Sequence, residues 1–90
     1  MGMNETSNTT YKWERTVWAE TGTVFYSLIR TDPEGGRITA ARITKQDGGY
    51  AYSVNDPDGS GLKPSGWEKR LHNAKDFAEL RAKNRFRFYD

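Results

Sequence analysis

The sequence contains no cysteine, one histidine and three prolines. Without cysteine the chain has no disulfide bond and no thiolate metal site, a composition that favours a cytoplasmic protein. No run of apolar residues approaches the roughly 18 that a membrane-spanning helix needs. The first ten residues are polar and lack the apolar segment of a secretory signal, so we expect no export.

Large aliphatic residues are also scarce, and aromatic residues must supply much of the core. Hydrophobic residues make up 34% of the chain, and four Phe, three Trp and five Tyr give an aromatic share of 13%. Each buried aromatic side chain removes roughly 150–250 Å² of surface from water. The net charge is only +2, from 14 basic and 12 acidic residues, so charge repulsion does not oppose folding. We expect a polar tail over residues 1–10 and one small domain over residues 11–90.

Alternating and β-branched residues in the first two thirds of the chain predict β-strands. Strands are expected over residues 11–20, 24–30, 37–45 and 50–55. Turn residues separate them at Thr21-Gly22, at residues 32–36 and at Asp47-Gly48, and the last pair is typical of a type I′ hairpin turn. A loop is expected over residues 56–66, and the alternation over residues 67–71 allows a short extra strand.

A helix is expected near the end of the chain, over residues 74–84. Asn73 is placed as its N-cap, and Asp76 as the capping-box partner three residues later. The helical spacing predicts an apolar stripe that faces the sheet. This stripe consists of Ala74, Phe77, Leu80 and Phe88, with Ala78 and Ala82 allowing close approach. The predicted fold is α+β, a three- to four-stranded antiparallel β-meander packed on one C-terminal α-helix.

The turn lengths determine which residues face each other across the strands. A two-residue turn at Asp47-Gly48 places Ile43 opposite Tyr52, and a four-residue loop over residues 33–36 places Ile43 opposite Tyr26. The predicted core face consists of Trp13, Val17, Val24, Tyr26, Leu28, Ala41, Ile43, Tyr52 and Val54. A one-residue slip in the loop 33–36 would exchange the two faces of the first two strands, and this alternative stays open.

The opposite, open face carries an aromatic pair and one arginine among small and polar residues. It consists of Thr16, Trp18, Phe25, Ser27, Ile29, Ala40, Arg42, Thr44, Ala51, Ser53 and Asn55. Exposed aromatic rings beside arginine are typical of protein-binding hot spots. We therefore predict a non-enzymatic protein-binding domain, an adaptor or a small inhibitor. Its interface would be Trp18, Phe25 and Arg42, with Arg85 and Arg87 at the rim. In the alternative, residues 1–10 or 56–66 cover the aromatic pair.

The C-terminal segment Arg85-Phe86-Arg87-Phe88-Tyr89 interleaves basic and aromatic residues, as nucleic-acid-binding segments do. The second prediction is therefore a DNA- or RNA-binding module. Its binding residues would be Arg42, Lys45, Lys69, Arg70, Lys75, Arg81, Lys83, Arg85 and Arg87. In the alternative, Phe86 and Phe88 fold onto the core while the arginines stay in solvent. The small net charge ranks this function second.

A three-stranded antiparallel sheet followed by one helix resembles the arm-binding domains of tyrosine integrases and the plant AP2-type DNA readers. The resemblance covers about residues 15–84, and Asn73-Ala74-Lys75-Asp76-Phe77-Ala78 stands where those domains start their helix. It implies an open sheet face that enters the major groove of DNA through Arg and Trp. Only Arg42 among the basic residues falls on the open face here. The same outline is similar to small phage and mobile-element proteins, including inhibitors of host defence, which implies a protein partner.

Metal, cofactor and catalytic sites find little support in the sequence. Asp56-Pro57-Asp58-Gly59-Ser60-Gly61 imitates the start of a calcium loop, but Trp67 stands where the final glutamate is needed, so we expect a connector. His72 is isolated and expected at the surface. No phosphate loop or metal-ligand spacing stands out. We therefore expect no enzyme, no cofactor and no metal.

Two further features concern the chain ends and the assembly. Gly2 fits a myristoylation pattern, and Asn4 and Asn8 fit glycosylation sequons, all of which we expect to be unused. An exposed edge strand can pair two copies of a chain. We therefore expect a monomer or an edge-strand homodimer, with a protein partner, nucleic acid as the alternative, and no membrane contact.

Overall fold

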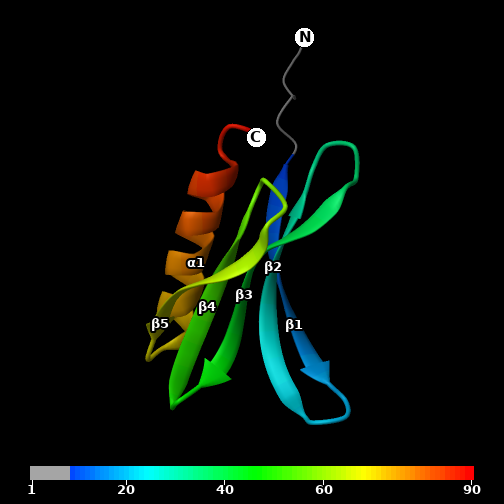
Figure 1. The fold of residues 1–90 in the computed structure, drawn as a ribbon. Helices are drawn as coiled ribbons and strands as arrows, with labels where there is room; N and C mark the ends of the chain where they lie inside the picture. Colours follow the sequence, from blue (N-terminus) through cyan, green and yellow to red (C-terminus); the bar gives the residue numbers. More distant parts are fainter. Residues whose placement is uncertain (1–8) are drawn as a thin grey trace.

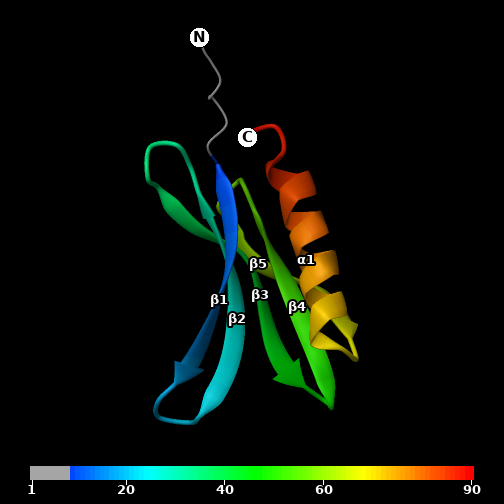
Figure 2. The same ribbon diagram turned by 180° about the vertical axis from the view of Figure 1, so that it is seen from behind.

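A computed structural model of the chain describes residues 9–90. The lipidation and glycosylation motifs at Gly2, Asn4 and Asn8, and most of the predicted polar tail, lie outside the described residues. Five strands and one helix follow each other along the chain (Figures 1 and 2). They are β1 (Thr10–Trp18), β2 (Thr23–Thr31), β3 (Arg37–Gln46), β4 (Gly49–Asp56), β5 (Gly61–Glu68) and α1 (Leu71–Phe86).

All five strands form one antiparallel sheet in the order β1-β2-β3-β4-β5, and α1 lies along one of its faces (Figures 1 and 2). The predicted α+β fold with one C-terminal helix is confirmed. The sheet has five strands where the sequence predicted three or four. A meander of this kind joins neighbouring strands by short turns, so every strand pairs with its neighbour in the sequence.

The register of the central strands follows from the hairpin at Asp47-Gly48. Both residues have positive φ, 54° and 75°, as a type I′ turn requires. Ile43 therefore pairs with Tyr52 on β4, as predicted from this turn. Ile43 also pairs with Tyr26 on β2 as predicted, but the predicted four-residue loop over residues 33–36 was wrong. Arg37 pairs with Thr31 and not with Asp32, and a bulge in β3 compensates for this shift of one residue. The slip that would have exchanged the two faces of β2 does not occur.

A β-bulge between β2 and β3 changes the predicted place of one residue. The register shifts between Leu28 and Ile29, which pair with Ala41 and Thr39, so Ala40 is the extra residue of β3. The prediction that Ala40 lies on the open face was wrong, because Ala40 is fully buried and belongs to the core.

The fifth strand differs from the sequence prediction in position. Residues 56–66 were expected to be a loop and residues 67–71 a short strand, whereas β5 spans Gly61–Glu68. β5 is an edge strand, where the missing N–H of Pro64 is tolerated. Its register against β4 shifts by one residue at Ser65. Gly66 then lies beneath the ring of Tyr52, and a Cβ at this position would clash with the Tyr52 hydroxyl.

The helix packs on the sheet through alanine and one phenylalanine. Its buried residues are Ala74, Ala78, Ala82 and Phe86, spaced four residues apart on one side of the helix. They contact the fully or nearly fully buried core residues of the sheet, which are Leu28, Ala41, Ile43, Tyr52 and Val54. Small helix residues bring the backbone of α1 close to the sheet, and the sheet supplies the large side chains.

The predicted apolar stripe of the helix was wrong for its large residues. Phe77, Leu80 and Phe88 are 41%, 65% and 84% exposed. The alanine row faces the sheet, and this rotation turns Phe77 and Leu80 towards solvent. Of the two phenylalanines in the C-terminal segment, Phe86 packs on the core, and Phe88 does not.

The start of the helix also differs from the prediction. Arg70 is the N-cap, with an extended backbone and no side-chain capping hydrogen bond, and the helix begins at Leu71. The predicted N-cap at Asn73 and its partner Asp76 therefore lie inside the helix. Leu71 packs against the core, and the first turn begins three residues earlier than the capping residues indicate.

The hairpin of β1 and β2 extends past the cover of the helix. α1 contacts β3, β4 and β5, and it reaches β1 only through long side chains. Trp13 is therefore half-buried, whereas Val17, which was predicted in the core, is 48% exposed.

Candidate functional site

The sheet face opposite α1 is the candidate site. The five strands belong to one sheet, and the helix of the described chain lies on the other face, so neither a second helix nor a second sheet covers it. The strand registers place two rows of side chains across the middle of this open face. One row is Thr16, Phe25, Thr44, Ala51 and Trp67, and the other is Glu14, Ser27, Arg42, Ser53 and Pro64.

Arg42 lies at the centre of the open face. Its neighbours across the strands are the small residues Ser27 and Ser53. Its guanidinium carbon is 5.0 Å from the ring centroid of Phe25, so the side chain lies along the sheet as a cation–π pair. The Nε of Arg42 is buried and has no hydrogen-bond partner. Among residues 9–90 no carboxylate forms an ion pair with this guanidinium.

Two tryptophans stand at opposite ends of the face. Trp18, the last residue of β1, is 56% exposed, and its ring centroid is 6.1 Å from that of Phe25. The loop between β4 and β5 does not cover it. Trp67, near the end of β5, is 45% exposed, and its Nε1 donates to the carbonyl oxygen of Gln46 at 2.9 Å. Its ring lies on Gly49, where any Cβ would clash with it.

Trp67 is a residue of the face that sequence reasoning missed. The sequence placed residues 67–71 in a separate short strand, so no register connected Trp67 with the open face. Only the strand register identifies Trp67 as part of the open face, because Trp67 pairs with Ala51. This pairing depends on the one-residue shift at Ser65. A bulge of this kind leaves no clear mark in the sequence.

The two arginines predicted at the rim lie in the other layer. Arg85 stands in the last turn of α1 and forms an ion pair with Asp56, which also binds the Nζ of Lys63 at 3.1 Å. Hydrogen bonds from Arg85 and Lys63 hold the pKa of Asp56 below its usual value. Arg87 follows the helix and stacks on Phe88 at 4.9 Å. The structure therefore brings Trp18, Phe25 and Arg42 together and leaves Arg85 and Arg87 apart from them.

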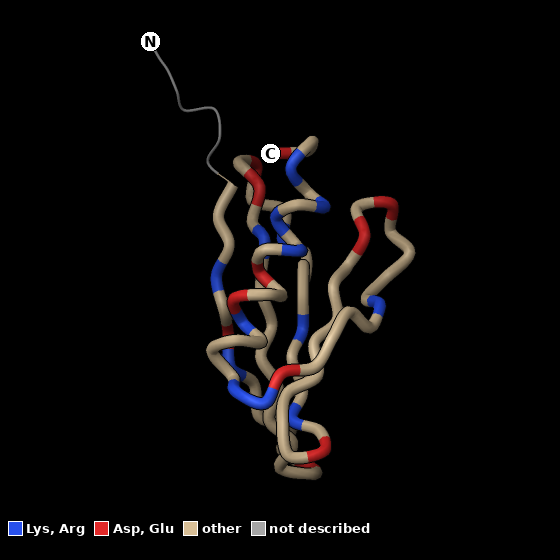
Figure 3. The backbone as a smooth tube through the Cα atoms, turned by 90° about the vertical axis from the view of Figure 1, so that its left-hand side faces the viewer, with Lys and Arg blue, Asp and Glu red and all other residues tan. Residues whose placement is uncertain are grey.

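The nine basic residues of the nucleic-acid prediction are spread over the molecule. Figure 3 shows basic and acidic positions interspersed along the chain. Arg42 is on the open face, Lys45 stands near the end of β3, Lys69 and Arg70 link β5 to α1, and the other five lie on or after the helix. Lys83 is paired with Glu79 at 2.9 Å, and Lys75 lies over the rings of Trp13 and Tyr26. This arrangement forms no single basic stripe.

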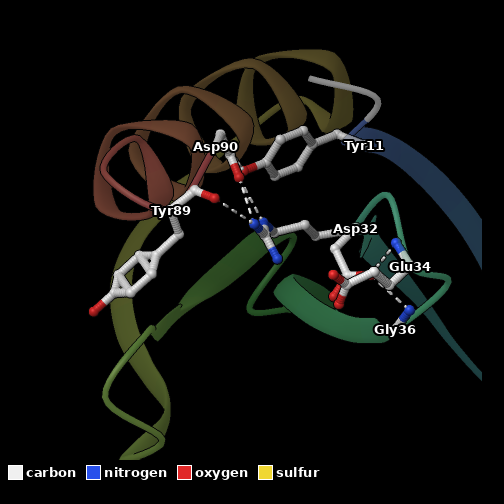
Figure 4. Close-up of polar contacts among 7 residues, drawn as sticks. Tyr11, Asp32, Glu34, Gly36, Tyr89 and Asp90 are labelled. Carbon is white, nitrogen blue, oxygen red and sulfur yellow. Dashed lines mark hydrogen bonds and ion pairs between the residues drawn. The ribbon is translucent and has the colours of Figure 1, made fainter. Parts of the chain in front are cut away.

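A second polar cluster joins the end of the chain to the sheet (Figure 4). Arg30 is 8% exposed, and its Nε and Nη2 donate to the carboxylate of Asp90 at 2.9 and 2.5 Å. The hydroxyl of Tyr11 donates to the same carboxylate at 2.6 Å. Burial and the Asp90 carboxylate both raise the pKa of Tyr11. These hydrogen bonds hold the C-terminal segment against β1 and β2, and the carboxylate of Asp90 neutralises the charge of Arg30.

Residues 9–90 show neither a cluster of metal ligands nor a helix that could cross a membrane. No group of three or more His, Asp or Glu side chains converges there on a point that could hold a metal ion. Within the calcium-like segment, Asp56 binds Arg85 and Lys63, and Asp58 accepts a hydrogen bond from the backbone N–H of Ser60 at 2.8 Å. The helix of the described chain is neither long enough nor apolar enough to cross a bilayer.

No family model, no curated protein and no solved structure matches this chain. A function for this chain must therefore be inferred from the residues of its open face.

Proposed function

We propose that the protein is a non-enzymatic protein-binding domain, an adaptor or a small inhibitor, which contacts its partner through the open face of the sheet. The observation that carries the proposal is the position of Arg42. Within residues 9–90 it is a cation without a carboxylate partner, at the centre of a sheet face that no other element covers, stacked on Phe25 and flanked by Trp18 and Trp67.

The chemistry of the face indicates the chemistry of the partner. Arginine has five N–H donors, and a carboxylate accepts two of them side by side. Trp18, Phe25 and Trp67 offer large apolar surfaces that lose little conformational freedom on binding. We therefore propose a partner surface that places a carboxylate on Arg42 and apolar side chains on the rings.

Nucleic acid remains the second candidate function, supported by the aromatic residues and the cation of the same face. Its main weakness is electrostatic, because affinity for a phosphate backbone grows with the number of free basic residues that reach it together. In this protein Lys83 and Arg85 are engaged by carboxylates, and the remaining basic residues lie on several different elements of the chain.

The first experiment is capture of the partner on tagged protein from a lysate of the source cells, with and without nuclease. We expect one protein to be retained after nuclease treatment and at about 0.5 M salt, where phosphate contacts are strongly weakened. If nuclease treatment abolishes the recovery, the partner is nucleic acid, and the second candidate function replaces the first.

The second experiment connects the captured partner to the face. Arg42→Ala and Trp18→Ala should each weaken the partner's affinity by about 30-fold or more, the loss typical of a central hot-spot residue. The matched control is Leu80→Ala, because Leu80 is an exposed apolar residue on the helix, away from the open face. Arg42→Ala binding as tightly as the wild type, with its fold intact by circular dichroism, would contradict the proposal.

A further inference from the structure

The two edges of the sheet differ in their fitness to pair with another strand. β5 contains Pro64 and a register shift at Ser65, both of which discourage pairing at its free edge. β1 has nine residues, no proline and an unbroken register against β2 from Thr10 to Trp18. The hydrogen bonds of residues 9–90 leave the outer edge of β1 without a partner. A long, regular edge strand without proline or a bulge is a template for a further strand.

We propose that a second copy of this chain pairs antiparallel along β1, with Trp13 of one copy opposite Trp13 of the other. This inference is independent of the proposed function, since it uses the edge of the sheet and not its open face. In this register Lys12 faces Glu14 of the second copy, and Tyr11 faces Arg15. Each of these pairs occurs twice because of the two-fold axis.

The charges of β1 select this register over its neighbours. In an antiparallel pair related by a two-fold axis, the residue on the axis faces itself. The central residues of this nine-residue strand are Lys12, Trp13, Glu14, Arg15 and Thr16, and only Trp13 and Thr16 are uncharged. An axis at Trp13 pairs residues 10–16 of each copy, whereas an axis at Thr16 pairs only residues 14–18. An axis at any of the other three places two like charges directly opposite each other, which is destabilising. An axis nearer either end of the strand pairs fewer residues.

The side chains that this pairing uses are accessible in the single chain. Lys12, Glu14 and Arg15 are exposed, and the described residues place no carboxylate on Lys12 or Arg15. Glu14 binds Arg37 through Oε2 at 2.7 Å, which leaves Oε1 for Lys12 of the second copy. Trp13 is held by a hydrogen bond from its Nε1 to Glu79 at 3.0 Å, so its ring is fixed on the helix side of the sheet.

The geometry of the pair has a consequence for the assembly. A two-fold axis perpendicular to the sheet keeps both helices on one side and both open faces on the other. The dimer therefore contains one continuous sheet, with an Arg42 site on each half.

Disulfide trapping tests the register directly, because the chain has no native cysteine. Single variants Lys12→Cys and Glu14→Cys, mixed and mildly oxidised, should form a mixed disulfide between the two proteins. Each variant alone should not cross-link, because its own Cys then lies diagonally across the strands, beyond the roughly 7 Å limit between Cα atoms. Lys69→Cys, an exposed position after β5, is the control. Cross-linking of Glu14→Cys alone, or of Lys12→Cys alone, would contradict the register.

Sedimentation of the unmodified chain tests the dimer itself. We expect a particle of twice the 10.3 kDa chain mass. Lys12→Glu should weaken the dimer by about tenfold or more, and the double variant Lys12→Glu, Glu14→Lys should restore it, since the opposed pairs regain opposite charges. Lys69→Glu should leave the dimer unchanged. A single-chain mass up to about millimolar concentration, or a dimer insensitive to Lys12→Glu, would overturn the proposal.

Discussion

At the scale of single residues, three alanines decide how the helix and the sheet fit together. Ala74, Ala78 and Ala82 are each fully buried between α1 and the sheet, whereas Leu80 on the same helix is largely exposed. A buried alanine has no room for a larger side chain unless the two layers separate. The interface therefore depends on small residues in a way that hydrophobicity alone does not indicate.

Substitution of the central alanine tests this packing. Ala78→Leu should lower the free energy of unfolding by about 1–3 kcal/mol, the usual result of overpacking a core, although leucine is the more hydrophobic residue. Leu80→Ala is the matched control and should change it by no more than about 0.5 kcal/mol, because Leu80 is at the surface. Urea denaturation measures both variants. A stabilised Ala78→Leu variant would show that the interface has space to spare.

The pKa of Glu79 makes part of the stability depend on pH. A hydrogen bond from Lys83, joined by one from Trp13, lowers this pKa against the opposing effect of partial burial. The folded state therefore holds the Glu79 proton more weakly than the unfolded chain does. The resulting stability is fully present above the unfolded pKa of about 4.3 and is lost as the pH falls through the lower folded value.

Replacement of Glu79 by glutamine removes this titration. Denaturation midpoints recorded between about pH 5 and pH 3 should fall less steeply for Glu79→Gln than for the wild type. Glu34→Gln is the control, because the side chain of Glu34 forms no ion pair within residues 9–90. Equal slopes for Glu79→Gln and the wild type would contradict the assignment.

At the scale of elements, the start of α1 is a place where the sequence is not optimal. Arg70 occupies the N-cap with φ −112° and ψ 140°, but its side chain makes no capping hydrogen bond. A positive charge at this end also opposes the helix dipole. A short side-chain oxygen acceptor here would satisfy one of the free N–H groups of the first turn.

Arg70→Ser should therefore stabilise the protein. The expected gain is about 0.5–2 kcal/mol, which raises Tm by roughly 4–8 °C for each kcal/mol in a domain of this size. Lys69→Ser removes a charge one residue earlier and supplies no cap, so its Tm should stay near that of the wild type. Thermal melts followed by circular dichroism compare the two. An unchanged or lower Tm for Arg70→Ser would contradict the N-cap at residue 70.

The elements also show how far the sequence determines the fold. The hairpin at Asp47-Gly48 fixed the register of β3 and β4, because a two-residue turn permits only one pairing. β5 was misplaced because its pairing depends on Pro64 at a tolerated edge and on a bulge at Ser65. The helix face was misassigned because hydrophobic spacing favours Phe77 and Leu80, whereas close packing selects the alanines. Because β5 was misplaced, the sequence analysis placed Trp18, Phe25 and Arg42 on the open face but missed Trp67.

At the scale of the whole molecule, the layers separate two kinds of surface. On the helix side, α1 covers the core of the sheet. The ion pairs of Asp56, of Glu79, and of Arg30 with Asp90 add to this contact. The open side presents aromatic rings around Arg42, which pairs with no carboxylate of residues 9–90. The three tryptophans divide between the layers, since Trp18 and Trp67 belong to the open face and Trp13 faces the helix.

This division allows one spectrum to test the central claim that the open face binds the partner. The indole N–H signals of the three tryptophans are recorded by ¹H–¹⁵N NMR at constant protein concentration while the captured partner is added. The signals of Trp18 and Trp67 should shift or broaden as the complex forms, and that of Trp13 should stay in place. A response confined to Trp13 and the amides of α1 would place the partner on the helix side and contradict the account.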